Sequence, residues 1–257
     1  MTAETDFAGR QLLGARPLQE DAYSFSETSD SIGRIDGVLI VVADGMGGHN
    51  AGERASETAV RTFVDSFHAV SGPSRDRLAK SLTAADDAIR KELQRDPDLE
   101  GMGCTLVAAI MTNAGVEWIS VGDSPLYLLR GSTLKRLNED HSLRPVLQEL
   151  AERDGQSVPE RHQAASANIL RSALTGQEIE MIDQSPEPIT LQAGDLILAA
   201  TDGIHTLNER EIIATCADSE SIDASVLADG LVQAIANVAN PKQDNVTIAI
   251  MKPRLGS

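Results

Sequence analysis

The sequence predicts a single α+β domain in which antiparallel sheets pack together and long helix pairs cover their outer faces. Short turns at residues 113–115 and 131–132 join apolar segments of strand length, which indicates hairpins and argues against a purely parallel sheet. Segments with helical spacing of apolar residues come in blocks and do not alternate with the strands. Residues 1–257 contain no low-complexity linker and no repeat of fixed period, so we expect one domain.

The strand predictions rest on short apolar runs bounded by turn residues. Residues 38–42 are five apolar residues in a row without helical spacing, which predicts a strand buried on both faces. A polar loop is expected at residues 27–37, before this strand. The other strands are expected at residues 7–19 (a strand and a turn), 21–26, 104–112, 116–121, 126–130, 133–137, 179–183, 196–201 and 246–251.

The helix predictions rest on apolar residues that recur every three or four positions. Residues 51–70 and 74–96 carry such stripes, and each stripe is ended by a pair that contains proline. Shorter helices are expected at residues 143–153 and from Glu209 onward. The last helix, residues 221–240, is expected to bury one apolar face, made of Val226, Leu227, Leu231, Ile235 and Val238.

The composition excludes several classes of function. Hydrophobic residues are 41% and charged residues 24%, as in ordinary globular proteins, and 3% aromatic residues imply a core of mainly Val, Ile, Leu and Ala. The net charge of −17 argues against binding of nucleic acid or of an anionic membrane, since both need an excess of Lys and Arg. Cys104 and Cys216 lack metal-binding spacing and are expected to be buried free thiols. Without an apolar leader or a segment of membrane length, we expect a soluble, cytoplasmic protein.

Six acidic residues stand where predicted strands begin or end, and this pattern is the functional signal. A folded sheet can bring such positions together, and the crowded carboxylates then repel one another unless divalent cations neutralise them. The six are Glu20, Asp21, Asp44, Asp123, Asp202 and Asp244. Oxygen ligands alone, to which the Gly45 carbonyl can be added, suit Mg²⁺ or Mn²⁺ rather than zinc. For Asp44-Gly45 taken alone, an ordinary strand-to-helix turn is the alternative.

Such a site suits attack on phosphorus. If Asp44 bridges two ions about 3.5–4 Å apart, the water that they share becomes a hydroxide nucleophile at neutral pH. Arg16 could hold phosphate oxygens with its guanidinium fork, and a surface ion pair with Glu20 is the alternative for this residue. The five histidines are scattered and are not expected to be ligands, and Asp140 is interpreted as a helix cap.

Seven motifs follow one another in an order that resembles a known family. They are RPLQEDAY (residues 16–23), VVADGMGGHNAGERAS (41–56), GMGCT (101–105), SVGDS (120–124), LNEDHSL (137–143), ATDGI (200–204) and QDNVT (243–247). In this order they resemble the metal-dependent protein phosphatases of the PPM, or type 2C, family in its short bacterial form. The resemblance covers about residues 8–251, nearly the whole chain.

The resemblance implies a β-sandwich of two antiparallel sheets with a helix pair on each outer face. It also implies hydrolysis of phosphoserine and phosphothreonine in proteins, by a hydroxide that bridges two Mn²⁺ or Mg²⁺ ions. It does not decide whether a third ion binds. The implied roles are Asp44 as bridging ligand, Gly45 as carbonyl ligand, Asp202 and Asp244 at the first metal, Glu20 and Asp21 through waters, Asp123 at the third metal and Arg16 at the phosphate. The irregular residues 142–176 fall where the family places a mobile flap. The expected partners are phosphorylated proteins and a cognate Ser/Thr kinase, and we expect a monomer.

Several departures from the family pattern, among them Thr201 in place of the more usual serine before Asp-Gly, concern substrate choice more than catalysis. Met46 stands where animal members have a histidine proposed as general acid, Pro125 replaces the usual arginine of the GDSR motif, and the flap matches poorly at residues 161–168. A non-catalytic phosphoprotein-binding regulator on the same fold is therefore the alternative function, and phosphodiester or nucleotide hydrolysis is a third. All ligand carboxylates are present, which favours an active phosphatase.

Overall fold

The computed structural model describes residues 5–29, 35–48, 51–154 and 169–253. The centre of the predicted flap, residues 155–168, lies outside the described residues, as do residues 30–34 of the predicted polar loop. Within the described ranges, no helix is both long enough and apolar enough to cross a membrane.

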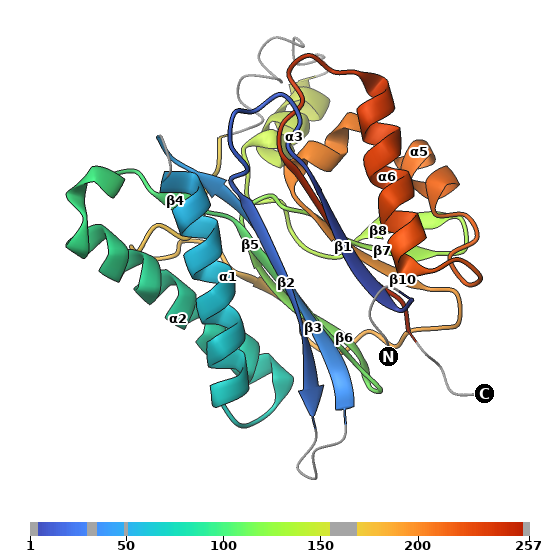
Figure 1. Cartoon of the computed structure of the whole chain (residues 1–257), viewed down its shortest axis with the longest axis horizontal. Coiled ribbons are helices and arrows are strands. Elements are labelled where there is room, and N and C mark those ends of the chain that lie inside the picture. Colours follow the sequence, from blue (N-terminus) through green and yellow to red (C-terminus); the bar gives the residue numbers. More distant parts are fainter. Residues whose placement is uncertain (1–4, 30–34, 49–50, 155–168, 254–257) are drawn as a thin grey trace.

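Two antiparallel sheets form the centre of the molecule (Figure 1). The five-stranded sheet has the order β1 (Phe7–Leu12), β11 (Val246–Met251), β10 (Leu196–Ala200), β7 (Leu126–Arg130) and β8 (Thr133–Arg136). The six-stranded sheet has the order β2 (Asp21–Ser29), β3 (Ile35–Met46), β5 (Leu106–Thr112), β6 (Gly115–Val121) and β9 (Asp183–Gln184), with β4 (Gly103–Cys104) paired to the end of β3.

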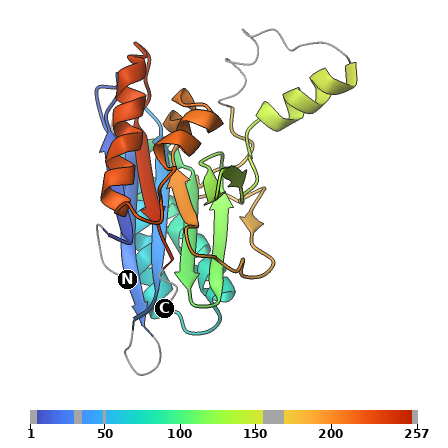
Figure 2. The same ribbon diagram turned by 90° about the vertical axis from the view of Figure 1, so that its right-hand side faces the viewer.

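Helices cover the outer face of each sheet (Figure 1). The pair α1 (Ala51–Ala69) and α2 (Ser74–Arg95) lies against the six-stranded sheet, and the pair α5 (Glu209–Thr215) and α6 (Ala224–Val238) lies against the five-stranded sheet. Figure 2 shows that α3 (Arg144–Asp154) projects away from these layers. Two short 3-10 helices, η1 (Pro97–Leu99) and η2 (Asp202–Thr206), complete the described elements.

Alternating side chains sort the core into three apolar layers. Along β3, Leu39 and Val41 pack with α1 and α2, whereas Ile40 and Val42 pack between the two sheets. On β10, Leu198 packs toward α6 by the same rule, because successive strand residues point to opposite faces. Three apolar layers separate four layers of structure, which confirms the predicted single α+β domain with an αββα sandwich.

Four sequence-based predictions were wrong in detail. The loop expected at residues 27–37 is shorter, because β2 runs to Ser29 and β3 begins at Ile35. The strand expected at residues 179–183 is reduced to the two residues of β9. Asp44 lies inside β3 rather than after it, because β4 adds pairing partners for the next two residues. On α6, Val226 and Val238 are 57% and 49% exposed and do not join the buried stripe.

Candidate metal centre

The predicted site residues converge at one end of the sandwich from segments far apart in the sequence. Asp21 is the first residue of β2 and is the direct cross-strand neighbour of Asp44 in β3. Asp123 follows β6 after Gly122, whose φ of +102° turns the chain. Asp202 opens η2 directly beyond β10, and Asp244 lies two residues before β11. Both sheets therefore contribute carboxylates to the same end.

A pocket of about 230 Å³ collects seven of the eight predicted site residues. They are Arg16, Glu20, Asp44, Gly45, Asp123, Asp202 and Asp244. Asp21 is the exception, because its carboxylate turns toward the five-stranded sheet. There its Oδ2 atom accepts hydrogen bonds from the hydroxyls of Thr201 (2.8 Å) and Thr247 (2.9 Å).

The carboxylates of this pocket carry more negative charge than the protein itself compensates. Burial, followed by the charges of Asp21, Asp202, Asp123 and Asp244, raises the pKa of Asp44 well above its ordinary value. Burial raises the pKa of Asp21 and that of Asp123 to about 7 each, with nearby carboxylates, Asp202 among them, adding to both shifts. A divalent cation would remove this penalty, because it favours the charged form of each group.

Arg16 supplies positive charge at the rim of the pocket. Its guanidinium donates to Asp244 Oδ2 at 2.7 Å and stands 3.9 Å from Glu20 Oε2. Burial acts against the charged form, but the bond to Asp244 and the neighbouring carboxylates raise the pKa of Arg16 overall. The ion pair that the sequence offered as an alternative is therefore present, with Asp244 rather than Glu20 as its nearer partner. The side chain is 48% exposed and can reach a group bound in the pocket.

The residues of the pocket fit hard divalent cations by their chemistry. Every candidate ligand is an oxygen, and two buried carboxylate oxygens, Glu20 Oε1 and Asp21 Oδ1, have no hydrogen-bond partner in the described part of the chain. As the side chains lie, no three acidic, histidine or cysteine residues within the described ranges form a group that could hold a metal ion. Binding of a metal ion therefore requires rotation of some of these side chains. In the structure, the Arg16 guanidinium neutralises the carboxylate of Asp244.

Comparison with known proteins identifies the family. The model of the family described as "Protein phosphatase 2C" matches residues 9–223. The chain belongs to the protein phosphatase 2C family. This confirms the predicted family and enzyme class, a metal-dependent protein serine/threonine phosphatase. The chain is 33% identical to the serine/threonine phosphatase stp of Listeria welshimeri over 226 residues, which are 84% of this chain and 85% of the relative.

Solved structures agree with this assignment. The serine/threonine phosphatase PstP/Ppp of Mycobacterium tuberculosis is 27% identical and superposes with a TM-score of 0.77, over 97% of this chain and 98% of that one. The catalytic domain of a phosphatase PstP in complex with two manganese ions is also 27% identical, with a TM-score of 0.74 over 96% of each chain. These neighbours confirm the fold of this type 2C phosphatase.

Gly45 of this phosphatase occupies a position that admits no side chain. A Cβ atom there would lie 2.1 Å from the Gly52 carbonyl oxygen and 2.4 Å from the Glu20 carbonyl oxygen. The Gly45 amide also donates to that Glu20 oxygen at 3.1 Å, which ties β3 to the loop before β2. Close packing of three segments therefore requires glycine at position 45, which an isolated turn would not need.

A buried polar network behind the pocket was missed by the sequence reasoning. Thr105 Oγ1 accepts a hydrogen bond from the Asp44 amide at 3.1 Å and lies 2.7 Å from Ser124 Oγ. Asn138 donates to the Ser124 carbonyl at 2.9 Å, and Arg136 donates to the Asp123 carbonyl at 2.7 Å. The motifs GMGCT, SVGDS and LNEDHSL contain or adjoin these residues. The sequence therefore marked these positions, but it did not indicate that they form one hydrogen-bond network. Asp140, which the sequence analysis interpreted as a helix cap, accepts a hydrogen bond from the Ser142 amide just before α3 begins, and it does not line the pocket.

Proposed function

We propose that this phosphatase hydrolyses phosphoserine and phosphothreonine in proteins with two Mn²⁺ or Mg²⁺ ions bound in the acidic pocket. The observation that carries the proposal is the convergence of Asp44, Asp123, Asp202 and Asp244 on one pocket with Arg16 at its rim. The manganese bound by the PstP catalytic domain and the name of the Listeria relative support the same chemistry here.

The proposed ligands are those that the family resemblance implies, and all of them except Asp21 line the pocket. Asp44, the Gly45 carbonyl, Asp202 and Asp244 would hold the two ions, and Asp123 would hold a third. Glu20 and Asp21, each with a buried oxygen that lacks a partner within the described residues, would act through waters. When bound, such ions neutralise the carboxylates and acidify a water so that it can attack phosphorus.

The protein's own groups bind and orient the substrate. Arg16 leaves Asp244 and takes the phosphate oxygens in a bidentate contact, since a guanidinium fork matches both acceptors. Thr105 fixes the backbone of Asp44 so that its carboxylate keeps one orientation while charge builds up on the phosphate. At the two ends of the expected flap that lie within the described residues, the Leu143 amide donates to the Ile169 carbonyl and the Arg171 amide donates to the His141 carbonyl.

The biological setting is a separate part of the proposal. The phosphatase acts as a monomer in the cytoplasm on proteins that a cognate Ser/Thr kinase phosphorylates. The net charge of −17 supports protein substrates over nucleic acids. The 33% sequence identity to the phosphatase stp is the main support for the proposal that a Ser/Thr kinase supplies its substrates.

A phosphothreonine peptide with added Mn²⁺ tests the proposal. We expect Mn²⁺-dependent release of phosphate by the wild type and a loss of at least about 100-fold in Asp202→Asn, because one charged ligand is removed. Release at an ordinary enzymatic rate excludes the non-catalytic regulator, and a phosphodiester assayed in parallel addresses the third alternative. A wild type no faster than Asp202→Asn with Mn²⁺, Mg²⁺ and other divalent cations would refute the proposal.

A further inference from the structure

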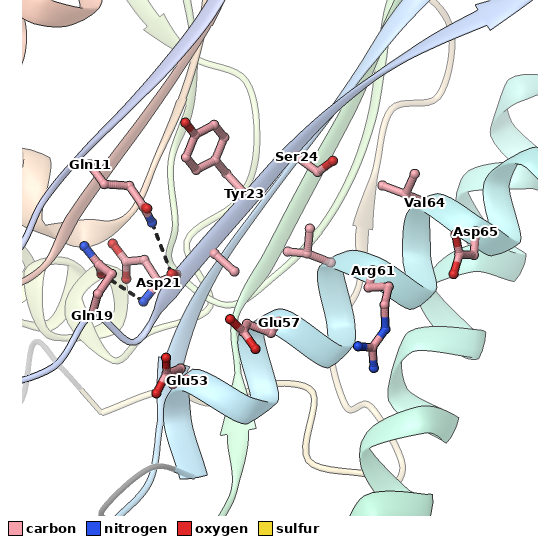
Figure 3. Close-up of a pocket in the computed structure, with 12 residues that line it drawn as sticks. Gln11, Gln19, Asp21, Tyr23, Ser24, Glu53, Glu57, Arg61, Val64 and Asp65 are labelled. Atoms are coloured by element: carbon pink, nitrogen blue, oxygen red, sulfur yellow. Dashed lines mark hydrogen bonds between the residues drawn. The ribbon is translucent and has the colours of Figure 1, made fainter.

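A second cavity, of about 640 Å³, lies between β2 and α1, outside the metal centre (Figure 3). One wall is the face of α1 that carries Glu53, Glu57, Arg61 and Asp65 at four-residue intervals. The opposite wall is formed by β2, from Asp21 to Ser24. We call this cavity the α1–β2 groove.

The α1–β2 groove is built to receive positive charge. Its α1 wall carries the three carboxylates of Glu53, Glu57 and Asp65 against the single guanidinium of Arg61. Within the described part of the chain, these three carboxylates form no salt bridge. Asp21, at the end near Gln19, is not counted with them, because its carboxylate bonds to Thr201 and Thr247 and belongs to the proposed metal centre. The groove thus contains negative charge that the protein does not itself neutralise.

The groove starts where the metal pocket ends. Glu20 lines the metal pocket, and the next residue, Asp21, lines the groove. The second turn of α1 touches the same junction, because the Ser56 hydroxyl donates to the Glu20 carbonyl at 2.6 Å. The two cavities share no lining residue, so a polypeptide whose phosphorylated side chain enters the metal pocket has to cross this junction to reach the groove.

The strand wall suits an extended segment. β2 is the edge strand of its sheet, with β3 as its neighbour on one side. On its other edge, the Asp21 amide donates to Gln19 Oε1 and the Asp21 carbonyl accepts from Gln11 Nε2, both at 3.1 Å, so the edge that can pair with a segment begins beyond Asp21. Four consecutive residues of β2 line the groove, although alternate side chains of a strand point to opposite faces. The lining therefore includes the strand edge itself, which is the surface that extended peptides recognise.

The length of the groove sets the size of the segment. Glu53 and Asp65 are twelve residues apart on α1, which corresponds to about 18 Å along the helix axis. An extended chain advances roughly 3.4 Å per residue, so about five residues fit along this wall.

We propose that the α1–β2 groove binds a lysine- or arginine-containing segment next to the phosphorylated residue of the substrate, in extended form along β2. This rests on the proposed function and adds to it a substrate class, phosphoproteins with basic residues flanking the phosphosite.

Matched phosphothreonine peptides test the proposal on the full chain with Mn²⁺. One series places two lysines two to four residues before the phosphothreonine, a second places them after it, and glutamine versions of both are the references. We expect the wild type to favour the lysine peptide of one series about three- to tenfold in kcat/KM, as two exposed ion pairs allow. The preference should shrink as salt is raised.

Charge-reversal variants assign the preference to the groove. Glu57→Lys and Asp65→Lys should abolish or invert the lysine preference, measured as a ratio within each variant. Glu220→Lys makes the same charge change near α6, on the other outer layer, and should keep the wild-type ratio. Glu180→Lys changes a cavity that adjoins the metal pocket at Met46 and Leu170, and it should also keep the ratio.

Each other outcome is decisive. An unchanged ratio in both groove variants, an equal loss in Glu220→Lys, or a loss confined to Glu180→Lys overturns the proposal. Hydrolysis of the glutamine peptides without any lysine preference overturns it while leaving the proposed phosphatase function intact. Failure to hydrolyse any peptide overturns both.

Discussion

Thr105→Val removes the hydroxyl that links Asp44 to the loop after β6, with almost no change of shape. In the wild type, Thr105 Oγ1 accepts from the Asp44 amide at 3.1 Å and shares a 2.7 Å contact with Ser124 Oγ. Thr105 and Ser124 are 3% and 1% exposed, so water does not replace the lost partner. The variant therefore leaves one buried amide and one buried hydroxyl without their bonds.

The expected loss of stability follows from these two groups. A buried polar group left without its partner costs about 1–3 kcal/mol, so for two such groups we expect the metal-free variant to lose about 2–6 kcal/mol of unfolding free energy. Because the Asp44 backbone loses one of the bonds that position it, the Mn²⁺ concentration for half-maximal activity should rise about tenfold or more. Urea unfolding measures the first effect, and a Mn²⁺ titration of phosphopeptide hydrolysis measures the second.

The control is Ser124→Ala, which removes the second hydroxyl but leaves Thr105 free to accept from Asp44. It should lose less stability than Thr105→Val and should shift the Mn²⁺ titration only slightly. The double variant should lose less than the sum of the two, because each single change breaks the same contact. The reasoning is refuted if Thr105→Val unfolds within 0.5 kcal/mol of the wild type, about the spread of ordinary surface substitutions.

Three further predictions concern other parts of the molecule. Gly45→Ala should destabilise the protein by about 3 kcal/mol and abolish turnover, since a Cβ would lie 2.1 Å from the Gly52 carbonyl oxygen; wild-type urea unfolding would contradict this. Arg130→Met should lower the unfolding free energy by about 3 kcal/mol, because Asp195, which is 1% exposed, loses its bidentate partner. Arg95→Met is the control and should cost under about 1 kcal/mol, because the Arg95 side chain is 73% exposed and Arg54 still pairs with Glu92. The metal-free protein should lose thermal stability as the pH rises from about 4 to 7. The pKa values of Asp21 and Asp123 are about 7 in the folded state and near 4 in the unfolded state. Between these values the folded state binds more protons than the unfolded state, so raising the pH favours unfolding. Mn²⁺ should restore stability above pH 7, and a melting temperature that is independent of pH without metal would count against the raised pKa values.

The layers of the fold could be predicted from the sequence because local patterns carry them. The five apolar residues at 38–42 predicted a buried strand, and the stripe of apolar residues along α1 predicted a helix that buries Phe63 and Phe67. Strand ends were less predictable where pairing partners come from far away. Asp44 falls within β3 because Gly103 and Cys104 pair beyond it, and no local pattern encodes that contact.

The site was predictable in its acids and not in what holds them. Asp202 and Asp244 stand at strand ends, where a sequence reading can expect convergence. The contact of Thr105 with the Asp44 amide joins residues 61 positions apart, and the Arg16–Asp244 pair joins residues 228 apart. Such pairs depend on the register of whole sheets, so they became visible only with the fold.

The apolar layer between the two sheets has a consequence for how this enzyme tolerates change. Asp44 and Asp123 belong to one sheet, and Asp202 and Asp244 belong to the other, so the thickness of this layer sets the gap between the two halves of the pocket. The layer includes small residues from both sheets, such as Ala109 and Ala199. A bulkier side chain there would push the two sheets apart and separate the two pairs of carboxylates, so turnover would fall even where the fold survives. Substitutions in this layer are therefore limited by the spacing of the carboxylates before they are limited by the stability of the core.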